Sequence, residues 1–151
     1  MVEDGPAVAR LPAALRDAIV AAARAAVPNE MCGLIVGSDA PAAGGTALRW
    51  AQAHNAAASP YVYEVDPDDL LRLSIEIDAR DEALWAIVHS HVASPARPSP
   101  IDVRRAFYPD ALHVIVSLAP TEADPATGAP SVRAWRIADE AATEVALEIA
   151  P

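Results

Sequence analysis

The chain has no lysine among its 151 residues, and all 11 of its basic residues are arginine. Aspartate and glutamate together number 21, so the formal net charge is −10. This balance argues against a nucleic-acid-binding protein, because affinity for phosphate backbones comes mainly from clustered lysine and arginine. A GC-rich coding sequence biased towards arginine and alanine is the simpler explanation of the missing lysine.

Cysteine and long apolar runs are also scarce. Cys32 is the only cysteine, which excludes an intrachain disulfide and gives no indication of an oxidising compartment. The acidic N-terminus lacks the basic region of a signal peptide. Charged residues at positions 16, 17 and 24 interrupt the apolar stretch Leu11–Val27, so this stretch is not a membrane span. We expect a soluble cytoplasmic protein that has no contact with a membrane.

Hydrophobic residues make up 53% of the chain, which is typical of a globular protein. The length suits one domain with a sizeable core, and we expect residues 1–151 to form a single domain. The periodicity of apolar residues mixes helices with mostly β segments, which predicts an α/β fold. Helices are predicted at 11–27, from 66 to about 77, and at 100–107. Strands are predicted at 31–36, 46–53, 61–65, 84–88 running on into His89, 112–118, and as a hairpin in the tail around a turn at 138–142.

The helix that starts near residue 66 has clear local signals. Asp66 can cap it and Pro67 suits its first turn, where acidic side chains also favour the positive helix end. Its buried face is predicted to consist of apolar residues at helical spacing, namely Leu70, Leu73 and Ile77, with Leu71 and Ile75 beside them.

The stretch from His89 to Asp102 is the most informative part of the sequence. Residues two apart in a strand point to the same side, so His89 and His91 can present both imidazoles to one ion. Asp102 can supply a third, anionic ligand after a proline-rich loop. Two nitrogens and one oxygen leave the fourth position of a tetrahedral zinc free for water, as hydrolytic sites require.

Two of the candidate residues also have a purely structural interpretation. Ser99 and Asp102 form a capping-box variant around a proline, and this would be their whole role if the histidines were absent. Glu30 stands between a helix-breaking proline and an apolar strand, where most glutamates are simply solvated. The histidines, which end a buried strand just before the cap, favour the functional interpretation, and both roles of Asp102 are compatible.

Two blocks of the sequence resemble the signature of the JAMM (MPN+) metallopeptidase family. The first is Pro28-Asn-Glu30-Met-Cys-Gly33-Leu-Ile-Val-Gly37, and the second is the His-x-His and Ser-x-x-Asp pattern. Further similarity to small bacterial members runs through 55–66 and 108–117. The resemblance implies a cytidine-deaminase-like fold, with a curved mixed or mostly antiparallel sheet packed with helices. It also implies that His89, His91 and Asp102 bind Zn²⁺, that Glu30 activates the water and passes its proton on, and that Ser99 stabilises the oxyanion.

The resemblance also suggests the substrate. Catalytic members cleave bonds on the carboxyl side of the C-terminal Gly-Gly of ubiquitin-like proteins, and this compact chain is most similar to peptidases that release cysteine from a sulfur carrier protein. One alternative is an isopeptidase that acts on Lys-linked conjugates, and a lysine-free enzyme of this kind would avoid becoming a substrate itself. A second alternative is a non-catalytic MPN scaffold, although such domains typically lack a ligand that is present here. RadC-like proteins fit poorly, because the residues around the histidines differ and the charge is acidic.

Several other residues receive weaker predictions. Cys32 shares the strand face of Glu30 and could line the site, although a small buried residue is the simpler interpretation. His113 is predicted to be a hydrogen-bonded core histidine, and no partner can be named for His54. Tyr61 and Tyr63 could flank a substrate groove or serve only in packing.

Overall fold

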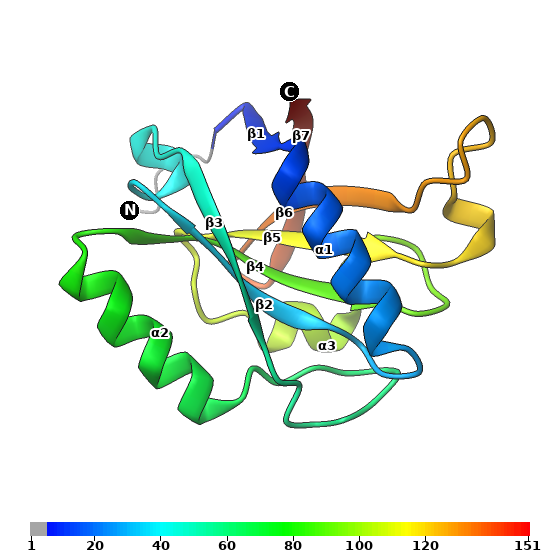
Figure 1. The fold of residues 1–151 in the computed structure, drawn as a ribbon, viewed down its shortest axis with the longest axis horizontal. Coiled ribbons are helices and arrows are strands. Elements are labelled where there is room, and N and C mark those ends of the chain that lie inside the picture. The colour runs from blue at the N-terminus through cyan, green and yellow to red at the C-terminus, as the bar shows by residue number, and fades with distance from the viewer. Residues whose placement is uncertain (1–5) are drawn as a thin grey trace.

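The computed structural model describes residues 6–151, which fold around a seven-stranded sheet (Figure 1). The strand order is β1-β7-β6-β5-β4-β2-β3; β1–β7 and β4–β5 pair in parallel and the other neighbours are antiparallel. The mixed sheet expected from the sequence is therefore confirmed. The strands are β1 (Val8–Pro12), β2 (Cys32–Gly37), β3 (Ala47–Ala53), β4 (Ala83–His91), β5 (Leu112–Ser117), β6 (Ser131–Ala138) and β7 (Ala141–Ala150).

Helices pack on both faces of the sheet. The α-helices are α1 (Ala13–Ala26), α2 (Pro67–Ala79) and α3 (Pro100–Arg104), and two short 3-10 turns, η1 and η2, cover Pro41–Ala43 and Pro120–Glu122. Ile19 of α1 belongs to a core that includes Ile35 and Val88, whereas Leu73 of α2 packs with Leu34 and Ile87. Because side chains alternate along a strand, successive residues of β2 and β4 pack against α1 on one face of the sheet and against α2 on the other. No helix in the described range 6–151 is long and apolar enough to cross a membrane.

The first strand was not predicted, and it displaces the start of the first helix. The sequence pattern assigns Leu11 to a helix, but residues 8–12 form an edge strand in which Leu11 pairs with Ile149 of β7. Leu11 is fully buried there. A parallel pairing between the two ends of the chain leaves no local signal, so α1 starts at Ala13 instead of Leu11. The helix predicted at 100–107 is also shorter and ends at Arg104.

The strand predicted at 61–65 is wrong. Only Val65 makes a bridge, to Asn55, and the rest of the segment is an irregular loop. The Asn55 side chain donates to the carbonyl of Val62 and accepts from the amide of Glu64. These backbone groups are therefore satisfied locally by one amide side chain, and the segment has no need of a neighbouring strand.

The predicted N-terminus of α2 is confirmed, since the Asp66 side chain accepts from the amide of Asp69 and Pro67 opens the helix. Its buried face is narrower than predicted. Leu73 and Ile77 are buried, but the two flanking apolar side chains are exposed, Leu71 at 62% and Ile75 at 61%. These two lie one turn apart on the opposite side of the helix from Leu73, facing solvent.

Candidate metal centre and active site

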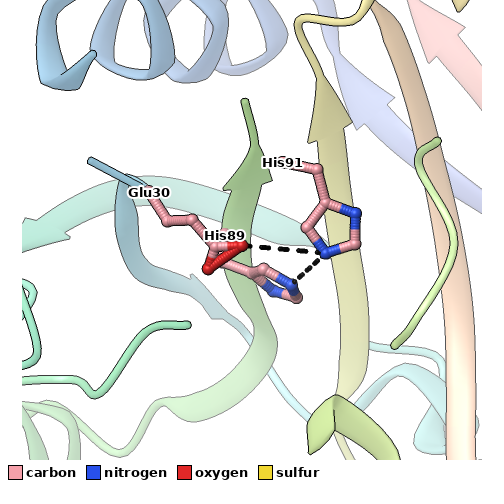
Figure 2. A group of neighbouring side chains, drawn as sticks. All are labelled: Glu30, His89 and His91. Atoms are coloured by element: carbon pink, nitrogen blue, oxygen red, sulfur yellow. Dashed lines mark hydrogen bonds and ion pairs between the residues drawn. The ribbon is translucent and has the colours of Figure 1, made fainter. Parts of the chain in front are cut away.

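The pairing of β2, β4 and β5 places the predicted site residues on one face of the sheet. Cys32 pairs with His89 and His91 pairs with Ser117, so alternation directs these side chains to the face opposite α1. Glu30 lies two residues before Cys32, close to the start of β2. Its carboxylate consequently comes up beside the end of β4, where Figure 2 shows it directed at the two imidazoles.

Three donor atoms form a nearly equilateral triangle at the end of β4. The His89 Nε2–His91 Nε2 distance is 3.2 Å, and Asp102 Oδ2 lies 3.2 Å from each nitrogen. A tetrahedral ion bound at about 2.0–2.1 Å would have donor–donor edges of about 3.3–3.4 Å. A hydrogen-bond network explains this triangle less well, because each Nε2 faces another nitrogen and a shared oxygen at the same time. The triangle therefore fits a divalent metal ion.

Asp102 is fixed by the short helix α3. The Ser99 hydroxyl accepts from the Asp102 amide at 3.1 Å, and Asp102 Oδ2 accepts from the Ser99 amide at 2.8 Å, so the predicted capping box is confirmed. Burial opposes the charge on Asp102, but its close contacts with His89 and His91 and the hydrogen bond from the Ser99 amide outweigh burial and hold the pKa of the carboxyl well below its usual range. The cap thus delivers an ionised carboxylate to the two imidazoles.

The two histidines are oriented by different contacts. His91 Nδ1 lies 2.7 Å from the carbonyl oxygen of Pro95 and must be the donor, because a carbonyl only accepts. This tautomer leaves the lone pair of Nε2 free for an ion. The ring of His89 stacks on Tyr63 at a centroid distance of 4.2 Å. Tyr63 therefore does more than the packing role considered for it, since it fixes the plane of a candidate ligand.

Glu30 is buried and only partly partnered. It is 3% exposed, its Oε1 lies 3.9 Å from His91 Nε2, and its Oε2 has no hydrogen-bond partner among the described residues. Burial raises the pKa of Glu30 to about 7. The backbone N–H of Glu30 donates a hydrogen bond to the carbonyl of Ser59, and the backbone carbonyl of Glu30 accepts one from the side chain of Asn55. Asn55 thus connects Glu30 to the 55–65 loop; its only signal in the sequence was its place in a motif.

Two sets of three residues could surround an ion. Glu30, His89 and His91 each offer a donor atom within 4.8 Å of the others. Asp102 lies closer to both imidazoles than Glu30 does and is ionised, whereas burial favours the neutral form of Glu30. Distance and charge therefore favour Asp102 over Glu30 as the third member of a metal-binding set with the two histidines.

The weaker predictions have mixed outcomes. Cys32 is fully buried, its thiol donates weakly to the carbonyl of His54, and burial raises its pKa to about 12, so it is an inert packing residue. His54 has a partner after all, since its Nδ1 lies 2.9 Å from Asp69 Oδ2. Tyr61 is 84% exposed, which argues against a packing role, and its place beside a substrate groove stays a prediction.

A mostly apolar cavity of about 260 Å³ adjoins the site. Asp102 and Tyr63 line it on the side of the triangle, and His113 of β5 lies in its wall. The prediction for His113 is half right: the residue is buried, but its Nε2 has no hydrogen-bond partner in residues 6–151. A larger hollow, between α1 and the 122–132 segment, contains none of the site residues.

His113 leads to a prediction about acid stability. Burial lowers the pKa of its imidazole to about 4, whereas an unfolded histidine titrates near 6.5. Between pH 6.5 and about 4, this histidine is protonated in the unfolded state and neutral in the folded state. The free energy of unfolding therefore falls as the pH drops through this range. We expect the free energy of unfolding of the metal-free parent chain to decrease between pH 7 and pH 4.5. In His113→Gln this decrease should be smaller by about 2 kcal/mol. Urea titrations at the two pH values measure this difference, and equal losses in both proteins would contradict the prediction.

Comparison with known proteins adds an independent line of evidence. The family model for prokaryotic homologues of the JAB domain matches residues 12–138. The CysO-cysteine peptidase of Mycobacterium tuberculosis is 38% identical over 133 residues, which cover 86% of this chain and 83% of that protein. The desampylase of Haloferax volcanii is 34% identical over 112 residues, covering 71% of this chain and 78% of that protein.

Solved structures agree with the fold. A protein from Desulfitobacterium hafniense, determined in solution, superposes with a TM-score of 0.78 at 29% identity, covering 95% of this chain and 92% of its own. A JAB1/MPN domain protein from Archaeoglobus fulgidus, at 19% identity, has a TM-score of 0.51, with 88% of this chain and 93% of that chain covered. The second likeness concerns the fold alone, and it matches the fold that the sequence motifs predicted.

Proposed function

The chain belongs to the family of prokaryotic homologues of the JAB domain, and we propose that it is a zinc metallopeptidase acting on a ubiquitin-like sulfur carrier protein. It hydrolyses the bond after the carrier's C-terminal Gly-Gly and releases cysteine. The observation behind the chemistry is the triangle of His89, His91 and Asp102 donors beside a buried glutamate. The observation behind the substrate is the 38% identity to a CysO-cysteine peptidase.

His89, His91 and Asp102 hold the Zn²⁺ ion, because two imidazoles and a carboxylate are ligands that zinc prefers. When bound, the ion lowers the pKa of water and polarises the scissile carbonyl. Glu30 takes the proton of the attacking water and transfers it to the leaving nitrogen of cysteine. Its raised pKa of about 7 suits this exchange, since a general base works best when its pKa lies near the operating pH.

The hydroxyl hydrogen of Ser99 is available to donate a hydrogen bond during the reaction. Its hydroxyl oxygen accepts from the Asp102 amide in the cap, which leaves the O–H free to donate. We place this donor at the carbonyl oxygen of the scissile bond as negative charge develops there. The two roles are compatible because one uses the lone pair and the other uses the proton.

Ser99→Ala should lower kcat by about 10²–10³-fold, the usual effect of removing one oxyanion donor. The lost cap should also destabilise the protein by about 1 kcal/mol. Ser99→Thr keeps a hydroxyl in both roles and serves as the matched control, which should recover most of the activity. Initial rates and urea unfolding of the two variants separate the effects. Equal kcat values for the alanine and threonine variants would remove Ser99 from the chemistry.

We further propose that one domain accounts for the predicted span of 1–151, of which residues 1–5 lie outside the described part of the chain. The strands β1 and β7 support this, because each reaches beyond the matched region 12–138 and still joins the central sheet. We also propose a cytoplasmic enzyme that binds neither nucleic acid nor membrane, and the acidic composition supports the part of this proposal that concerns nucleic acid.

A second substrate class is also supported by a relative. The 34% identity to a desampylase favours cleavage of isopeptide bonds to lysine side chains of conjugated proteins. Both activities need the same donor triangle and the same Glu30, and they differ only in the amine that leaves the Gly-Gly carbonyl. The absence of lysine from the chain agrees with this alternative, because the enzyme itself cannot be conjugated through a side-chain amine.

The test is intact-mass spectrometry of two substrates incubated with the zinc-loaded protein. One is a folded carrier ending in Gly-Gly-Cys, and the other is the same carrier joined through Gly-Gly to a lysine side chain of a peptide. We expect the first substrate to lose one cysteine, and we expect no loss when a chelator is added. Cleavage of the second alone would move the assignment to isopeptide conjugates. With zinc bound, cleavage of neither would contradict a peptidase.

A further inference from the structure

Three successive carbonyl groups of the loop between β4 and α3 accept hydrogen bonds from three different strands. The carbonyl of Ser94 accepts from the hydroxyl of Ser117 in β5 at 2.6 Å. The carbonyl of Pro95 accepts from His91 in β4 at 2.7 Å. The carbonyl of Ala96 accepts from the indole nitrogen of Trp135 in β6 at 2.9 Å. The loop is therefore fastened to the sheet on both sides of the contact made by His91.

The three donors lie on the same face of the sheet, although Trp135 is not level with the other two along the strands. His91 pairs with Ser117, and His113, at the other end of β5, pairs with Trp135. All of these side chains belong to the face that carries the donor triangle. The methyl group of Ala96 is fully buried with Ile115 and Trp135 in a small apolar cluster. Packing and hydrogen bonding thus fix the same short segment, at positions 94–96.

The middle carbonyl controls what His91 can offer to an ion. While His91 Nδ1 donates to Pro95, its Nε2 carries a lone pair pointing at His89 and Asp102. If the carbonyl moved away, the imidazole could adopt the other tautomer, with a proton on Nε2 directed into the triangle. Ring orientation would also be freed, because Pro95 is the partner that holds the outer side of the ring.

We propose that Ser117 and Trp135 are positioning residues for His91. They act through the carbonyls of residues 94–96 and keep the lone pair of His91 Nε2 directed at the metal position. This inference rests on the metal site of the proposed function. The side-chain hydrogen bonds of both residues go to the loop and not to the donor triangle. They act on His91 through the loop backbone, to which Ser117 is bonded from β5 and Trp135 from β6.

The experiment compares Trp135→Phe with a matched control, Trp85→Phe. Trp85 is also buried in the sheet, and its indole donates to the carbonyl of Gly45 at 3.0 Å, in a loop remote from the site. Both variants keep an aromatic ring and lose one indole hydrogen bond to a loop carbonyl. Zinc affinity is measured by competition with a chromophoric chelator. We expect about a 10-fold loss of affinity in Trp135→Phe and an unchanged affinity in Trp85→Phe.

A second variant, Ser117→Ala, tests the same loop from its other side and should also weaken zinc binding by about 10-fold. Imidazole ¹⁵N spectra of metal-free protein should show His91 protonated at Nδ1 in the parent chain and a growing Nε2–H population in both variants. Parent-like zinc affinity and tautomer in Trp135→Phe and Ser117→Ala, with folding verified by circular dichroism, would overturn the inference alone. Failure of the parent chain to bind zinc would overturn the proposed function, and this inference with it.

Discussion

Replacing Glu30 with glutamine is expected to lower kcat by about 10²–10⁴-fold, the range that general acid–base catalysis contributes. Glutamine has nearly the same shape and still fits the buried position, where Glu30 is 3% exposed. It cannot take up a proton from water or pass one to the leaving nitrogen. The three donor atoms of His89, His91 and Asp102 are untouched, so zinc should remain bound at one equivalent.

Initial rates of cysteine release and metal content by plasma mass spectrometry check both parts of this prediction. Glu82→Gln is the matched control, since Glu82 is a partly buried glutamate that pairs with Arg49 at 2.6 Å. That variant should lose some stability and keep its kcat. A Glu30→Gln variant with full activity would remove the proton-transfer role, and one that has lost its zinc would make Glu30 a ligand instead.

Replacing Asp102 with asparagine is expected to abolish activity by a different route, through loss of the metal. Asp102 Oδ2 lies 3.2 Å from both imidazole nitrogens and is the anion of the triangle. A neutral amide oxygen is a much weaker zinc ligand, so affinity should fall by more than the roughly 10–100-fold that outer partners of metal ligands cost. The amide oxygen can still accept from the Ser99 amide, so α3 should survive.

The control for this substitution is Asp66→Asn, which changes the same residue type at the N-terminus of another helix. Asp66 caps α2 by accepting from the amide of Asp69, and asparagine is an equally good cap. Zinc affinity should therefore be unchanged in that variant. Tight zinc binding by a folded Asp102→Asn protein would show that a different residue, with Glu30 the nearest candidate, completes the site.

Much of the local structure could be predicted directly from the sequence. The capping box of Ser99 and Asp102, the start of α2 at Asp66 and the strand that ends in His89 and His91 all agree with the predicted pattern. Each depends on neighbours within a few residues: a side chain bonding a nearby amide, or alternation along one strand. Where a competing local contact intervened, as Asn55 does in the 55–65 loop, the predicted strand was wrong.

The sequence by itself therefore determined which chemical groups are available: two histidines on one side of a strand, a capped aspartate, a serine and a glutamate before an apolar run. Only the tertiary structure decided how they meet. The antiparallel pairing of β2 with β4 brings Glu30 to His91 from a distant part of the chain, and β1 joins β7 from opposite ends. The carbonyl contacts of residues 94–96 likewise need β4, β5 and β6 in register. Such pairings are stabilised by hydrogen bonds and burial between distant segments, and these interactions leave no periodic or local mark in either segment alone.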